Sequence, residues 1–200
     1  MGLGGDYVHE YGALDYEWID LQADEPALTF SDAEVWAEQW LADHAMWQPG
    51  PAERLLLVDL DNLRAEPARL RDRLALVRVV ARTADRAFFA GETATVARCR
   101  AALDDGIGTI LTVGSGPDAA DLALLEAARR RRGSGQSRRA VQFVVVSNDH
   151  IFARVARHGT LTLLSPDLAA ASRQLRAAST RAHDVKTYER PLTAALLRSA

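Results

Sequence analysis

The sequence has almost no cysteine and almost no lysine. Its single cysteine, Cys99, cannot form an internal disulfide, and its isolation excludes a zinc site built from several cysteines. Lys186 is the only lysine, so every other basic side chain is an arginine. No stretch approaches the ~20 apolar residues of a membrane span, and residues 1–30 lack the basic start and apolar run of a secretory signal. We therefore expect a soluble, cytoplasmic protein.

Positive charge is missing from the first fifty residues. Residues 1–50 contain 11 Asp or Glu and no Lys or Arg, whereas residues 51–200 hold 16 acidic and 24 basic residues, a balance of +8. A basic body suits a polyanionic partner such as RNA, although the arginine bias can equally reflect genome composition. Two interpretations of the acidic segment stay open: it docks on the basic face and competes with RNA, or it is a solvated extension.

The Pro-Gly-Pro sequence at 49–51 marks a domain boundary. Before it, Ser31 and Glu34 have the spacing of a capping box, which predicts a helix over 31–47. We therefore divide the chain into an acidic N-terminal extension (1–50) with one helix, an α/β domain (51–180) and a partly helical tail (181–200). A hydrophobic content of 48% is enough to build a core.

Five short apolar runs alternate with helical patterns after this boundary. This alternation is typical of a parallel sheet with right-handed crossovers. Two strand orders are typical of such a sheet, 3-2-1-4-5 and 2-1-3-4-5, and the first makes strands one and four neighbours. The predicted strands are 55–58, 84–91, 108–113, 141–147 and 160–164, and the predicted helices are 67–81, 92–103, 117–132, a short one ending at 157, and 165–179.

Acidic and polar side chains follow the apolar runs directly. Ligands of open α/β sheets bind outside the carboxyl ends of the strands, so side chains from three distant segments should meet at one edge. Clustered carboxylates are the ligands that Mg²⁺ or Mn²⁺ prefers, and a bound ion would polarise a phosphodiester and activate a water. The side chains concerned are Asp59, Asp61 and Asn62 after the first run, Asp118 and Asp121 at a helix start, and Ser147, Asp149 and His150 after the fourth run.

The segments VDLDN (58–62), GPDAADLALL (116–125) and VVVSNDHIFA (144–153) resemble the NYN branch of the PIN-like nucleases, over roughly residues 54–165. The resemblance implies a three-layer α/β fold with a central parallel sheet of about five strands. It also implies a metal-dependent ribonuclease that uses Mg²⁺ or Mn²⁺. Its catalytic residues would be Asp59, Asn62, Asp121 and Asp149, with the three aspartates as metal ligands and with Asp61, Asp118, Ser147 and His150 as candidate support.

Two arginines are placed to contact RNA phosphates. Arg64 and Arg154 follow the first and fourth strands, close in sequence to the predicted metal ligands. A homodimer is left open, because the sequence carries no signal for or against one.

Two other functions remain open. Ile151 occupies the position of a second acid in the third NYN motif, which leaves room for a weakened relative that binds RNA or a protein without catalysis. An apolar run before Asp-x-Asp also resembles haloacid-dehalogenase-like phosphatases, with Asp59 as nucleophile and Asp61 as acid. That family needs a downstream lysine, and Lys186 near the C-terminus is the only one.

Overall fold

Six strands form one parallel sheet in the computed structural model of the chain, which describes residues 29–103, 106–130 and 140–189. The order of the strands across the sheet is β3-β2-β1-β4-β5-β6. Every pair of neighbouring strands is parallel. The strands are β1 (Ala52–Asp59), β2 (Arg86–Glu92), β3 (Thr109–Val113), β4 (Ala140–Val146), β5 (Thr160–Ser165) and β6 (Arg181–Asp184).

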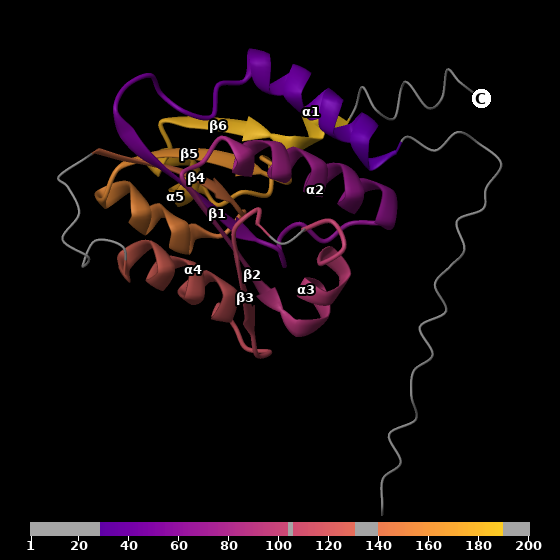
Figure 1. The fold of residues 1–200 in the computed structure, drawn as a ribbon. Helices are drawn as coiled ribbons and strands as arrows, with labels where there is room; N and C mark the ends of the chain where they lie inside the picture. Colours follow the sequence, from indigo (N-terminus) through magenta and orange to yellow (C-terminus); the bar gives the residue numbers. More distant parts are fainter. Residues whose placement is uncertain (1–28, 104–105, 131–139, 190–200) are drawn as a thin grey trace, which may run out of the picture.

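Helices cover both faces of this sheet (Figure 1). Leu56 and Val58 of β1 pack with α1, α2 and α3, whereas Leu55 and Leu57 pack with α4, η2 and α5. This alternation follows from the pleat of a strand, which sends successive side chains to opposite faces. The expected three-layer α/β architecture is therefore present. The helices are α1 (Phe30–Asp43), α2 (Pro67–Arg82), α3 (Thr93–Cys99), α4 (Ala119–Arg130), the 3₁₀ helix η2 (His150–Arg157) and α5 (Arg173–Ala178).

The strand order settles which chain segments share an edge of the sheet. Strands one to five follow the predicted order 3-2-1-4-5, so the alternative 2-1-3-4-5 is wrong. β1 and β4 are hydrogen-bonded neighbours, and Val58 lies opposite Val146. Because the strands are parallel, the residues that follow these two valines emerge at the same edge.

The sixth strand was not predicted, because its sequence lacks an apolar run. β6 reads RAHD and lies at an edge of the sheet, where its side chains are mostly half-exposed. The backbone N–H and the hydroxyl of Thr180 both donate to the carbonyl of Leu161, which brings the chain alongside β5. The tail from 181 thus begins as a strand. The partial helix expected there is present at 185–189, and residues 190–200 lie outside the described residues.

The helix predicted over 165–179 is much shorter in the structure. α5 begins at Arg173, where the side chain of Ser172 accepts a hydrogen bond from the Leu175 N–H and caps the helix. Ser165 is the last residue of β5, and its hydroxyl donates to Asn148 and accepts from the Asp167 N–H. The residues between β5 and α5 form turns around Asp167.

The first helix starts and ends earlier than predicted. Thr29 and Asp32 form its capping box, in place of Ser31 and Glu34, and the helix ends at Asp43 rather than at residue 47. Glu34 instead forms ion pairs with Arg78 and Arg82 of α2. α1 therefore packs on the α/β layers, while residues 1–28 of the acidic segment lie outside the described residues.

No helix in the described part of the chain is both long enough and apolar enough to cross a membrane.

Candidate metal centre

Asp59 ends β1 and is almost fully buried, with 2% of its surface exposed. Its Oδ1 accepts hydrogen bonds from the backbone N–H groups of Asp61 (3.0 Å) and Asn62 (3.3 Å). Its Oδ2 accepts from the Asn62 side-chain amide and from the Ser147 hydroxyl, the latter at 3.2 Å. Burial raises the pKa of Asp59, while the hydrogen bonds from Asn62 oppose that rise. The carboxylate is held in one orientation by four donors.

Asn62 connects the ends of β1 and β4. Its amide nitrogen donates to Asp59, and its carbonyl oxygen accepts from the Asn148 N–H at 3.3 Å. The Asn148 side chain is fixed in turn by the hydroxyl of Ser165, at the end of β5, over 2.6 Å. Hydrogen bonds thus run across the carboxyl ends of three neighbouring strands. These hydrogen bonds fix the side chains of the loop that follows β1.

Asp121 reaches the same edge from α4. This helix packs over β1, β2 and β3, because it connects β3 to β4 and the two strands β2 and β1 lie between them. Before it, Asp118 adopts a left-handed backbone conformation (φ 58°), and its carbonyl accepts from the Leu122 N–H as the helix begins. The side chain of Asp121 is 7% exposed, and its Oδ1 has no hydrogen-bond partner among the described residues. A buried carboxylate oxygen without a partner is costly and calls for a ligand.

Burial and neighbouring negative charge raise the pKa of Asp121 to about 7. Burial is the larger cause, followed by the charges of Asp59 and Asp149. A carboxyl group with this pKa is largely protonated or poised to ionise near neutral pH. A bound cation would remove the repulsion and keep all three groups ionised.

Asp149 completes the cluster from the end of β4. One ligand oxygen from each of Asp118, Asp121 and Asp149 can be chosen so that all lie within 4.8 Å of one another. Oδ1 of Asp149 also accepts from the Ile151 N–H (2.8 Å) and so caps η2, and it lies 2.9 Å from Nδ1 of His150. Capping and metal binding are compatible, because a carboxylate has several lone pairs to share.

These residues fit a hard divalent cation. All candidate ligand atoms are carboxylate oxygens, the donor type that Mg²⁺ and Mn²⁺ favour. The close cluster contains Asp118, whereas Asp59 interacts with Asp121 from the side of β1. Asp118 is therefore better placed as a ligand than its sequence position alone indicates.

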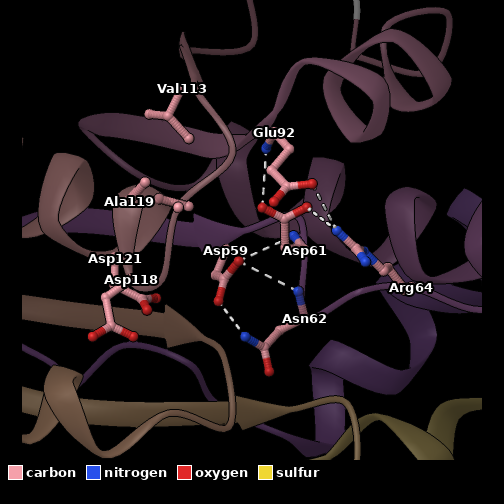
Figure 2. Close-up of a pocket in the computed structure, with 11 residues that line it drawn as sticks. Asp59, Asp61, Asn62, Arg64, Glu92, Val113, Asp118, Ala119 and Asp121 are labelled. Atoms are coloured by element: carbon pink, nitrogen blue, oxygen red, sulfur yellow. Dashed lines mark hydrogen bonds and ion pairs between the residues drawn. The ribbon is translucent and has the colours of Figure 1, made fainter.

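A pocket opens beside the cluster (Figure 2). Figure 2 shows the carboxylates of Asp118 and Asp121 side by side and, across the pocket from them, Arg64 with Asp61 and Glu92. The Arg64 guanidinium lies 3.0 Å from Asp61 and 3.3 Å from Glu92. The pocket is lined by Asp59, Asp61, Asn62, Arg64, Glu92, Val113, Gly116, Asp118, Ala119, Ala120 and Asp121.

Glu92 was missed by sequence reasoning. It is the last residue of β2, the neighbour of β1, and an acid at the carboxyl end of a central strand was the signal that could have found it. Asp61 holds the chain there, because its Oδ2 accepts from the Glu92 N–H at 3.0 Å. Burial would raise the pKa of Asp61, but hydrogen bonds from Thr95, Arg64 and the Glu92 N–H lower it.

Two predicted site residues are exposed and do not line the pocket. Arg154 is exposed on η2 and does not line the pocket. His150 is also exposed, and Nδ1 of its ring lies 2.9 Å from Oδ1 of Asp149. Ile151, at the position where the resembled family has an acid, is buried in the core with 7% of its surface exposed.

Neither a protein-family model nor a curated protein matches this chain in sequence. The family suggested by the three motifs stays a prediction, and a function must be argued from the geometry of the site.

Proposed function

We propose that the protein is a metal-dependent ribonuclease that hydrolyses phosphodiester bonds at the carboxyl edge of its sheet. The observation that carries this proposal is the cluster of Asp118, Asp121 and Asp149, in which one carboxylate oxygen of each lies within 4.8 Å of the others. Within that cluster, the buried Oδ1 of Asp121 has no hydrogen-bond partner among the described residues. A cluster of this kind suits a divalent cation and a phosphate better than it suits a neutral ligand. The basic balance of residues 51–200 favours a polyanion as the substrate.

Asp118, Asp121 and Asp149 would hold the ion directly, and Asp59 would complete the set from β1. When bound, the ion supplies the charge that polarises a phosphodiester and lowers the pKa of an attacking water. Asn62 and Ser147 keep the Asp59 carboxylate oriented toward the cluster through their hydrogen bonds. Arg64, more than half exposed at the pocket wall, can exchange its contact with Glu92 for a substrate phosphate.

The geometry disfavours a haloacid-dehalogenase-like phosphatase. Asp59 accepts four hydrogen bonds and is 2% exposed, so it is poorly available as a nucleophile. Asp61, the acid in that mechanism, is engaged by Arg64 and the Glu92 N–H. The only lysine, Lys186, pairs with Asp167 over 2.6 Å.

The second candidate function is binding of RNA or a protein without hydrolysis. It is favoured by the burial of Ile151, which gives η2 an apolar residue in place of an acid. Such a protein would still bind a cation through the aspartate cluster, so metal binding alone does not distinguish the two functions.

Hydrolysis of labelled single-stranded RNA separates them. We expect cleavage that requires Mn²⁺ or Mg²⁺, that stops with EDTA, and that is lost in Asp121→Asn and Asp149→Asn. Asp167→Asn is a matched control, since Asp167 pairs with Lys186 and follows a different strand. RNA binding without cleavage by the metal-loaded wild type would favour the second function. Phosphate release from a phosphomonoester would instead revive the phosphatase.

A further inference from the structure

A buried ion pair joins the end of the described chain to the middle of the fold. Nε of Arg73, on α2, lies 2.5 Å from Oε1 of Glu189, at the end of the helical segment 185–189. Each side chain is only 9% exposed. A buried pair of this kind costs desolvation and is weak evidence for stability by itself. We therefore ask what other groups the Arg73 side chain contacts.

The same guanidinium contacts the loop that carries part of the site. Nη1 of Arg73 lies 3.3 Å from the carbonyl oxygens of Leu63 and Arg64. Both carbonyls belong to residues 60–66, the connection between β1 and α2. A planar guanidinium can serve a carboxylate and two carbonyls at once, which a lysine ammonium on its flexible stem cannot do in this geometry.

Glu189 is itself held in place. Within the same helical segment, Tyr188 is 2% exposed and its hydroxyl donates to the Ala33 carbonyl of α1 over 2.8 Å. Val185 is also buried in the core beside α1 and α2. The carboxylate that neutralises Arg73 therefore belongs to an anchored segment.

We propose that Arg73 is a positioning residue for the metal centre. By holding the carbonyls of residues 63 and 64, it fixes the loop whose N–H groups, those of Asp61 and Asn62, donate to Oδ1 of Asp59. Glu189 acts as its counter-ion and thereby connects the C-terminal side of the described chain to the site. The inference rests on the proposed metal site, but the loop restraint itself can be measured without metal or RNA.

The test uses full-length Arg73→Lys and Glu189→Gln, with Arg69→Lys as a matched control. Arg69 lies on the same helix and forms an exposed ion pair with Glu66, so its conversion to lysine should change neither readout. The two readouts are the hydrogen exchange of the Asp61 and Asn62 amides in the metal-free protein and the Mn²⁺ affinity from calorimetry. Thermal unfolding is recorded for each variant to separate local from global effects.

In Arg73→Lys we expect the two amides to exchange about tenfold faster and Mn²⁺ to bind about threefold to tenfold more weakly, near the lower range for residues that orient metal ligands. The Leu60 amide, which donates to Ala90 of β2 at 2.8 Å, should stay protected. Glu189→Gln should change amide exchange and Mn²⁺ affinity in the same direction by a smaller factor. If Arg73→Lys does not fold, Glu189→Gln alone tests whether the ion pair restrains the loop.

Amide exchange and Mn²⁺ affinity within twofold of Arg69→Lys, in a variant that merely melts earlier, would overturn the proposal. Wild-type protein that binds no Mn²⁺ would overturn the metal centre as such, whereas faster exchange of the two amides would still establish the loop restraint.

Discussion

The hydroxyl of Ser147 donates to Oδ2 of Asp59 over 3.2 Å, although 88 positions separate the two residues in the chain. The same Ser147 oxygen accepts from the Asp149 N–H at 3.1 Å. One buried hydroxyl therefore connects the acids that end β1 and β4. This contact exists because the strand order places those two strands next to each other.

Removing the groups that orient Asp59 should weaken metal binding more than it weakens the fold. In Asn62→Ala the carboxylate loses a side-chain donor and the Asn148 N–H loses its acceptor. We expect Mn²⁺ affinity to fall about 10- to 100-fold, the range for partners of metal ligands, and about tenfold in Ser147→Ala. Calorimetric titration measures both. Ser179→Ala is the control. It also removes a hydroxyl that donates a hydrogen bond, to the Leu175 carbonyl, but Ser179 caps the end of α5 and does not contact Asp59.

Neutralising Asp121 should stabilise the metal-free protein at alkaline pH. Its pKa is about 7 in the folded state and near 3.8 when exposed, so the folded state binds the extra proton between these values. Stability of the metal-free wild type should therefore rise as the pH falls from 7 toward 4 through this group. Asp121→Asn should remove that dependence and gain about 1–3 kcal/mol near pH 8. Thermal unfolding at several pH values, with EDTA present, measures the stability of both proteins. A variant less stable than the wild type at pH 8 would contradict a free-energy cost for ionising this buried carboxyl group.

Mn²⁺ affinity should fall steeply below neutral pH. The ion must displace the proton of Asp121, whose pKa is raised to about 7 mainly by burial and then by Asp59 and Asp149. With one proton released per ion, the affinity should decline about tenfold per pH unit below 7 and level off above it. Calorimetry at pH 6, 7 and 8 tests this, with buffers of different ionisation enthalpy to count protons. An affinity independent of pH would show that Asp121 is not a ligand.

The first five strands could be read from the sequence because each is a short apolar run, whereas their order stayed open between two alternatives and only the folded structure selects 3-2-1-4-5. The edge strand β6 could not, since its stability comes from pairing with β5 and not from its own side chains. Likewise, α5 begins only at Arg173, and the N–H of its cap residue Ser172 donates to the carbonyl of Asn148, a contact between distant segments that no local pattern reveals.

In the site, too, some residues could be predicted from the sequence and others only from the folded structure. Asp59, Asp121 and Asp149 could be proposed from strand ends and a helix start, because backbone topology alone brings them to one edge. The closer role of Asp118 depends on its left-handed backbone (φ 58°), which turns its side chain toward Asp121 and Asp149. Glu92 depends on the hydrogen bond between its N–H and Asp61. Both features belong to the folded chain and have no periodic signature.

Cys99 should be silent toward thiol reagents until the protein unfolds. The side chain, at the end of α3, is fully buried in the core that α1, α2 and α3 share with the sheet, and burial raises the pKa of its thiol to about 11. Because it is the only cysteine, labelling with a coloured disulfide reagent reports one site. We expect less than stoichiometric labelling over hours in buffer and full labelling in denaturant. Rapid labelling of the native protein would mean that α3 opens frequently.

Deleting residues 1–28 should increase RNA affinity at low salt. This segment contains seven of the 27 acidic residues and no Lys or Arg, while α1 with its Thr29 cap is kept, so the fold should be retained. If the acidic segment competes with RNA for the basic body, its loss should strengthen binding of single-stranded RNA several-fold at 50 mM salt and much less at 300 mM, because salt screens such competition. Fluorescence anisotropy of labelled RNA measures the affinity. All proteins carry Asp121→Asn, so that the RNA is not cleaved during the measurement. Replacing the seven acids by Asn or Gln in the full-length chain is the charge control, and equal affinity in all three proteins would show that the segment is a solvated extension.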